Sequence, residues 1–313
     1  MGVPAGTFKS FEAVGNREDL SDIITNISPT ETQFYSKIRE AQGGASATKH
    51  EWQTDALAAT GANAHLEGDD TTFAGVTPTV RVYNMCQIQK KSVIISGTQE
   101  SAKLKKAGRT SELNYQTAKK AKELANDVEY AFLRGVRVDG DAATARAMRG
   151  ALNWCITNVS KEATAVLNAD GTITPGVARA ITQAILDGVL QDIWTAGGNP
   201  DTIYCPAAQK RKISALATAA LTNYRVAVEG NKLDTTIDVY VSEFGTHALK
   251  PHRVIPADSI FICSHEHFKK ATLRNTLREK LSKTGDNEKW HILVEHTLES
   301  NAEKASGRIV DLS

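Results

Sequence analysis

The chain contains a long segment that cannot build a core of its own, residues 56–76, with the sequence ALAATGANAHLEGDDTTFAGV. It lies between two stretches with strand-like alternation, KHEWQTD and TPTVRVYNMCQIQKKSVIIS. In the second stretch, one face is expected to carry Val80, Val82, Cys86 and Ile88. The segment is long for a hairpin turn and rich in Gly, Ala and Thr. We therefore predict an extended hairpin whose tip projects from the body as a long, mobile loop.

Two short amphipathic helices are predicted ahead of this hairpin. The spacing i, i+3, i+4, i+7 is shown by Leu20, Ile23, Ile24 and Ile27. Ser28-Pro29-Thr30-Glu31 then resembles a capping box that starts a second helix. That helix would present Phe34, Tyr35 and Ile38, and a Gly-rich linker, AQGGASATKH, follows. The apolar faces of both helices are expected to need a surface from elsewhere.

The rest of the sequence, after the hairpin, predicts an α+β fold in which helices and strands are segregated. A long helix is expected over 110–134, with one stripe formed by Leu113, Thr117, Ala121, Leu124, Val128 and Ala131 or Phe132. Thr174-Pro175 would open a second helix that stops at Gly197-Gly198, and Pro206 a third. The expected strands are DTIYC, TTIDVYVSEF, HRVIP, SIFICS and WHILVEHTLES.

Composition excludes several classes of protein. With 41% hydrophobic residues in 313, the chain can bury a substantial core. Its 37 basic and 36 acidic residues give no overall field toward nucleic acid or an anionic membrane. Its four cysteines form no CxxC pair, which argues against a disulfide framework. Because no run of about 18 apolar residues occurs, we expect a protein that is neither secreted nor membrane-spanning.

Catalytic and metal-binding motifs are weak. The best metal candidate is Cys263, His265 and His267, which could begin a zinc site, although a core strand running into a polar turn is the stronger interpretation. Glu67, Asp69 and Asp70 could hold calcium but lack the spacing of a calcium loop, so a solvated loop tip is favoured.

One basic run stands out in the last third of the chain. Only Glu279 interrupts the bases Lys269, Lys270, Arg274, Arg278, Lys280 and Lys283. A solvated face is the favoured interpretation, and contacts with neighbouring subunits or DNA phosphates are the alternative.

Taken in order, these pieces resemble the Hong Kong 97-type capsid fold, and the resemblance covers essentially the whole chain. The segments GNREDLSDIITNISPTETQFYSKI, TTFAGVTPTVRVYN and MRGALNWCITN are similar to a family of major head proteins of tailed phages. The resemblance implies a shell protein that forms hexamers and pentamers around double-stranded DNA, without a cofactor, catalytic turnover or a membrane. It also implies a virion location after assembly in the host cytoplasm, with scaffold, portal and decoration proteins as further partners.

Carried onto this sequence, the resemblance implies five regions: an N-terminal arm over 1–48, an extended loop over 49–96, a peripheral domain with a spine helix over 97–150, an axial domain over 151–250, and return strands of the peripheral domain over 251–313. It places the assembly interface at Leu20, Ile23, Ile24, Ile27, Phe34, Trp52, Val80 and Val82. Two alternatives stay open, an encapsulin-like compartment of the same fold and a metal-dependent enzyme at Cys263 to His267.

A first prediction concerns covalent crosslinking. Some relatives of this fold join subunits by Lys to Asn isopeptide bonds, with the lysine in the extended loop. Here no lysine occurs from His50 to Gln89, so the nucleophilic amine is missing from the loop tip. We expect boiled, denatured particles to run as a single monomer band on a denaturing gel, and a covalent ladder would contradict this.

Overall fold

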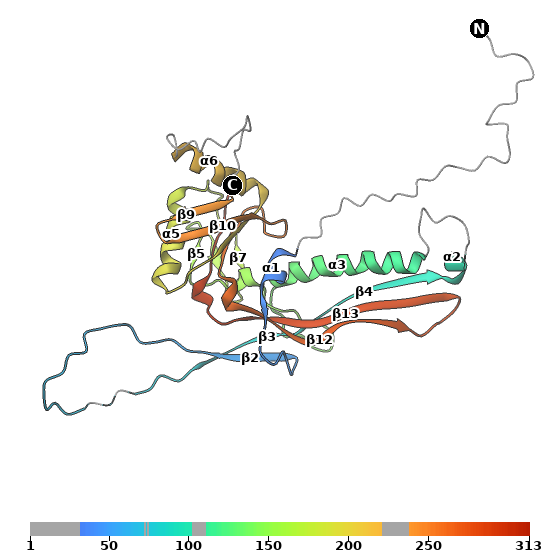
Figure 1. The fold of residues 1–313 in the computed structure, drawn as a ribbon, viewed down its shortest axis with the longest axis horizontal. Helices are drawn as coiled ribbons and strands as arrows, with labels where there is room; N and C mark the ends of the chain where they lie inside the picture. Colours follow the sequence, from blue (N-terminus) through green and yellow to red (C-terminus); the bar gives the residue numbers. More distant parts are fainter. Residues whose placement is uncertain (1–31, 72, 74, 102–110, 221–237) are drawn as a thin grey trace, which may run out of the picture.

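The computed structural model describes residues 32–71, 73, 75–101, 111–220 and 238–313. These residues form two main sheets and a projecting hairpin (Figure 1). The four-stranded sheet has the order β1-β12-β13-β4, and the six-stranded sheet has the order β5-β14-β11-β8-β10-β9. Two-stranded ribbons pair β2 with β3 and β6 with β7. The result is an α+β fold, as predicted.

The elements of the first half of the described chain, in order, are α1 (Gln33–Lys37), β1 (Arg39–Glu40), β2 (Lys49–Thr54), β3 (Val80–Met85), β4 (Gln87–Ser96), α2 (Gly97–Ser101), α3 (Glu112–Arg134) and α4 (Ala151–Trp154). The second half continues with β5 (Val159–Ser160), β6 (Val166–Leu167), β7 (Ile173–Thr174), α5 (Gln183–Thr195), β8 (Thr202–Cys205), α6 (Ala207–Ala220), β9 (Val239–Ser242) and β10 (Gly245–Pro251). The chain ends with β11 (Ile260–Cys263), the 3-10 turn η1 (His265–His267), β12 (Phe268–Leu281), β13 (Asn287–Ser300), η2 (Glu303–Ala305) and β14 (Gly307–Ile309).

The predicted long helix is α3, and it covers one face of the four-stranded sheet (Figure 1). The Ser111 hydroxyl accepts from the Asn114 amide and so caps its N-terminus. Leu124 and Val128 of α3 belong to one buried cluster with Ile292 and Val294 of β13. The stripe differs from the prediction at two positions, because Ala121 is exposed and Glu129 is fully buried.

The six-stranded sheet has its own core on the face covered by α5 and α6. Ile203 on β8, Leu249 on β10 and Ile262 on β11 pack there with Leu190 and Ile213 from the two helices. The opposite face turns toward the four-stranded sheet, where Tyr204 and Phe261 join the cluster that also contains Phe132 and Leu298. A shared apolar core therefore connects the two sheets.

Three sequence predictions of local structure are corrected. The helix expected from Thr174 begins at Gln183, because Thr174 pairs with Val166 and the segment after it donates amides of Gly176 and Arg179 to Asp311. HRVIP is not a strand, since His252 leaves the sheet to reach Glu129 on α3. Conversely, the basic run was not expected to be a strand and is β12.

The strands after residue 251 are divided between the two sheets. Of the four strands after it, β12 and β13 lie in the four-stranded sheet, whereas β11 and β14 lie in the six-stranded sheet. The chain thus crosses between the sheets more than once after residue 251. Sheet pairing over such sequence distances leaves no local signal.

Phe34 is the clearest correction to the predicted arm. It was expected to dock on another subunit, but its side chain is 0% exposed and lies inside its own chain. Its ring packs edge-on against Phe261 and Phe268, with ring centroids 6.0 and 5.6 Å away. The helix α1 that carries it is therefore held by the body of the same molecule.

We predict that Phe34→Ala lowers the unfolding free energy of the dissociated subunit by about 3–5 kcal/mol, because it leaves a cavity between two rings. The matched control is Phe73→Ala, whose side chain is 94% exposed and should leave unfolding unchanged. Urea denaturation followed by tryptophan fluorescence measures both. Equal stability of the two variants would contradict the burial of Phe34.

Candidate assembly interface

The β2–β3 hairpin is firmly rooted in the body. Trp52 donates its indole N–H to the Ser300 carbonyl at 2.9 Å, and its ring lies 5.5 Å from that of Trp154. The fully buried Asn84 amide donates to the carbonyls of Arg149 and Leu298 at 3.1 and 2.7 Å. The direction of the hairpin is therefore fixed where it leaves the body.

Beyond this root the hairpin projects away from the rest of the chain (Figure 1). Pairing ends at Thr54 and Val80, and the connecting loop exposes large apolar side chains. The exposed fractions are 99% for Leu57, 85% for Leu66, 94% for Phe73, 94% for Val76 and 61% for Val80. Several large apolar side chains left in solvent on one projection are typical of a surface that binds another protein.

A second uncovered apolar surface is the face of the four-stranded sheet opposite α3, here called the bare face. On β4, Gln89 and Lys91 turn toward α3, where they contact Asp127. Side chains alternate along a strand, so the intervening residues point to the other side. That side exposes Ile88, Ile94, Leu277 and Leu281, with fractions of 46%, 63%, 51% and 39%.

The start of the described chain is held by the buried carboxylate of Glu129. Its two oxygens accept the amides of Phe34 and Tyr35 at 2.8 Å each. His252 contributes a third contact at 2.8 Å through Nε2. Because His252 Nδ1 accepts the Val254 amide, its proton lies on Nε2 and is donated to Glu129. Neither Glu129 nor His252 was predicted from the sequence as a functional residue.

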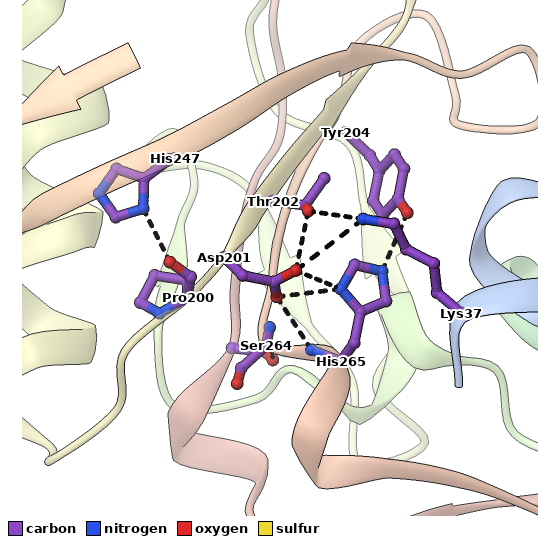
Figure 2. A network of polar contacts seen from close by, with 9 residues as sticks. Lys37, Pro200, Asp201, Thr202, Tyr204, His247, Ser264 and His265 are labelled. Carbon is purple, nitrogen blue, oxygen red and sulfur yellow. Dashed lines mark hydrogen bonds and ion pairs between the residues drawn. The ribbon is translucent and has the colours of Figure 1, made fainter. Parts of the chain in front are cut away.

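A polar network next to α1 joins it to the six-stranded sheet (Figure 2). His265 Nδ1 lies 2.7 Å from Asp201, and its Nε2 lies 2.9 Å from the Tyr204 hydroxyl oxygen. Lys37 of α1 donates to Thr202 at 3.2 Å. Burial raises the pKa of Asp201, but the hydrogen bonds and charge of His265 outweigh this and hold that pKa well below its usual range.

These contacts argue against the candidate metal site at Cys263, His265 and His267 and agree with the favoured interpretation of a core strand that runs into a polar turn. His265 is engaged by Asp201 and Tyr204, and burial together with the Asp201 charge raises the pKa of the Cys263 thiol well above its ordinary value. A thiol that stays protonated is a poor metal ligand. Within the described ranges, no three or more His, Cys, Asp or Glu side chains lie close enough together to hold a metal ion. This applies both to the turn after Cys263 and to the loop acids Glu67, Asp69 and Asp70.

The basic run is largely paired within its own chain. The ion pairs join Lys270 to Glu40, Arg274 to Glu295, and both Lys280 and Lys283 to Glu288. Arg278 stacks on the Trp290 ring at 4.3 Å. Arg274, Arg278, Lys280 and Lys283 are nevertheless exposed, so the run lies on a solvated face, as favoured from the sequence, and its charges have partners on the same surface.

Comparison with known proteins identifies the family. The family model described as the SU10 major capsid protein matches residues 4–313. The chain therefore belongs to the SU10 major capsid protein family. A curated major capsid protein of Escherichia phage Phieco32 is 27% identical over 96% of this chain and 95% of its own length. The predicted function as the major capsid protein of a phage shell is confirmed.

Solved structures support the same conclusion for the fold. A chain of the cyanophage A-1(L) capsid has a TM-score of 0.68 at 11% identity, over 97% of this chain and 98% of its own. The SrpI encapsulin of Synechococcus elongatus has a TM-score of 0.59 at 8% identity, over 95% and 92% of the two chains. The capsid protein thus has the predicted Hong Kong 97-type fold, which encapsulins share.

The predicted interface residues of the capsid protein fall into three groups. Those of the first helix, Leu20, Ile23, Ile24 and Ile27, lie outside the described residues. Phe34 is buried in its own chain, and Trp52 and Val82 are partly buried against the same core. Val80 is exposed on the hairpin. Sequence reasoning missed Leu57, Leu66, Phe73 and Val76, although large apolar residues without periodic partners were a usable signal.

No helix in the described part of the capsid protein combines the length and apolar character needed to cross a bilayer.

The core beneath α1 of the capsid protein contains a buried histidine. His296 is 1% exposed and packs against the rings of Phe132 and Tyr35, with centroids 4.8 and 5.8 Å away. Its Nε2 lies 2.9 Å from Gln89 Oε1. Burial, followed by the nearby charge of Lys270, lowers the pKa of His296 from 6.5 to about 4.

This pKa predicts acid sensitivity of the subunit. Between pH 6.5 and 4 the unfolded chain binds a proton at His296 that the folded chain does not, so stability falls as the pH drops through this window. The expected contribution is about 3 kcal/mol in all. We expect His296→Phe to flatten the pH dependence of the unfolding free energy measured from pH 7 to 4.5. An unchanged slope in that variant would contradict the assignment.

Proposed function

We propose that copies of this chain associate into hexamers and pentamers through the projecting loop, which docks on a neighbouring copy. The single observation that carries the proposal is the exposure of Leu57, Leu66, Phe73 and Val76 on a hairpin directed away from its own body. Burying such a side chain contributes about 1.5–3 kcal/mol. Burial of this loop against another copy would therefore contribute a large favourable free energy to association.

The bare face of a second copy is the surface that best fits this loop. It offers exposed Ile88, Ile94, Leu277 and Leu281, and the exposed Lys90 lies among them. The loop carries acids at Glu67, Asp69 and Asp70 beside its apolar side chains. A contact between two different surfaces of the same protein is heterologous, and heterologous contacts close into rings when the rotation allows.

Other features of the shell are inferred from the family. We propose that Leu20, Ile23, Ile24 and Ile27 form an arm that docks on a neighbouring subunit. The parts around the six-stranded and four-stranded sheets would serve as axial and peripheral domains. The shell would enclose double-stranded DNA without sequence-specific binding and would be assembled in the host cytoplasm, with scaffold, portal and decoration proteins as possible partners. We assign the chain a structural role without catalysis.

The encapsulin-like alternative rests on a fold that the SrpI encapsulin shares, whereas the family membership favours the phage shell. Negative-stain electron microscopy and sedimentation of the expressed full chain test the shared architecture, and the contents of purified particles separate the two functions. Uniform closed shells support assembly by this chain. A stable monomer, even when co-expressed with its neighbouring structural genes, would overturn the proposal.

We predict that the double variant Leu66→Asp and Phe73→Asp folds normally but does not form shells. Both side chains are exposed in the subunit, so the charges cost little there, whereas burial at an interface costs several kcal/mol. Thr60→Asp, which adds one charge to the same exposed loop, is the control and should still assemble. Sedimentation velocity and circular dichroism read out assembly and folding, and normal shells from the double variant would contradict the docking role of the loop.

A further inference from the structure

The charged side chains of the bare face can be placed from the strand register. Lys90 and Ile94 alternate along β4 with residues that turn toward α3, and both are exposed. Their partners on β13 are Leu293 and Lys289. Residues paired across antiparallel strands lie on the same face of a sheet. Lys289 therefore lies on the bare face with Lys90, and among the described residues neither lysine belongs to an ion pair.

The other charges of the bare face are paired with one another. Glu295 accepts hydrogen bonds from Arg146 Nη2 at 2.8 Å and from Arg274 Nε at 2.7 Å. Glu279 lies 3.2 Å from the Nε2 atom of His291, its partner in the strand register. With the two lysines, the face carries four bases against two acids when His291 is counted as neutral. Positive charge is therefore in excess.

Two further acids lie at the end of the bare face next to the hairpin root. Asp139 and Asp141 line a cavity there together with Arg146. Asp139 also pairs with Arg137 at 3.4 Å. These acids balance the arginines at this end, which is therefore close to neutral. The excess of positive charge lies further along β4 and β13, at the two lysines.

The turn between β12 and β13, at the opposite end of the face, is also basic. Glu288 pairs there with both Lys280 and Lys283, and Asp286 is the other acid of the turn. With Lys289, three lysines stand against these two acids. A carboxylate that approaches Lys289 therefore enters a region of positive charge.

The projecting loop has the opposite charge. Its exposed carboxylates, here called the acidic tip, are Glu67, Asp69 and Asp70. No Lys or Arg occurs from residue 55 to residue 80, and His65 lies 3.6 Å from Asp69. The exposed Leu66 and Phe73 flank the acidic tip in the sequence. A surface that buries these two apolar side chains therefore also meets the carboxylates between them.

Given the proposed docking of the loop, on which this inference rests, we propose that Lys90 and Lys289 of one copy bind the acidic tip of a neighbouring copy. This charge pairing selects the head-to-tail contact between copies. Two bare faces brought together would oppose like charges, and so would two loops. The loop on the bare face instead joins opposite charges beside apolar side chains on both surfaces. Such a heterologous contact can close into a ring, whereas two bare faces stacked on each other would stop at a dimer.

A charge exchange between the two surfaces tests this pairing. In the double variant Lys90→Glu and Lys289→Glu, shell formation in cells that also express the neighbouring structural genes should fall about tenfold or more, because attractive contacts become repulsive. Adding Asp69→Lys and Asp70→Lys to the same chain exchanges the signs and should restore shells. Sedimentation measures shells, and circular dichroism measures folding.

The matched control is the double variant Lys119→Glu and Lys122→Glu. It makes the same change in net charge on exposed residues of α3, on the other side of the sheet, and should assemble like the wild type.

Normal assembly of the reversed lysine variant would overturn the charge pairing, and so would a folded, charge-exchanged chain that still forms no shells. The docking of the loop is judged separately by the variant with Leu66→Asp and Phe73→Asp. Loss of shells in that variant, with normal assembly of the reversed lysine variant, would leave the docking in place and remove only the charge pairing.

The double variant Lys90→Gln and Lys289→Gln is the milder alternative if reversed charges prevent folding. The urea concentration that dissociates purified wild-type shells should fall as sodium chloride rises from about 50 to 500 mM, because salt screens exposed charge pairs. Shells of the Gln variant should show a smaller fall. An equal fall in both chains would overturn the proposal.

Discussion

The buried carboxylate of Glu129 is the contact on which the arrangement of the capsid protein depends. It lies on the spine helix α3 with no exposed surface, so each of its oxygens must find donors inside the protein. The donors come from two segments distant in sequence, the amides at the start of α1 and the ring of His252 after β10. One side chain therefore fixes the spine helix, the start of the body and a connection from the six-stranded sheet together. Removing it would leave three buried polar groups without partners.

Around this contact, some apolar surfaces are packed within the chain and others are left exposed to solvent. The face of the four-stranded sheet next to α3 is packed with Leu124, Val128, Ile292 and Val294, whereas the opposite face and the projecting loop keep large apolar side chains in solvent. In an isolated protein this exposure would favour aggregation. A shell needs each subunit to present surfaces that another copy covers, and the proposed docking of the loop on the bare face would give this exposure a use.

The junction between the sheets is chemically different from these open surfaces. It contains polar groups, such as the network of Asp201, His265 and Tyr204 beside α1. Polar contacts specify one geometry, since each donor must meet its acceptor. Apolar contacts tolerate small shifts more readily. The relative position of the two sheets is thus set by these hydrogen bonds together with the shared apolar core.

The sequence determined the elements whose signal is local. The long helix is recognised from its period, the β2–β3 hairpin from its alternation, and the projecting loop from the lack of core-forming residues between the strands. The family resemblance was likewise contained in short segments. Tertiary structure decided what depends on partners distant in sequence. Phe34 looked like a residue for another subunit because no neighbour in sequence could cover it, yet Phe261 and Phe268 do so across more than two hundred positions. The basic β12 became a strand of the four-stranded sheet because β13 and Glu295 pair with it. Periodicity records which face of an element is apolar, but it carries no information about which distant surface will cover that face.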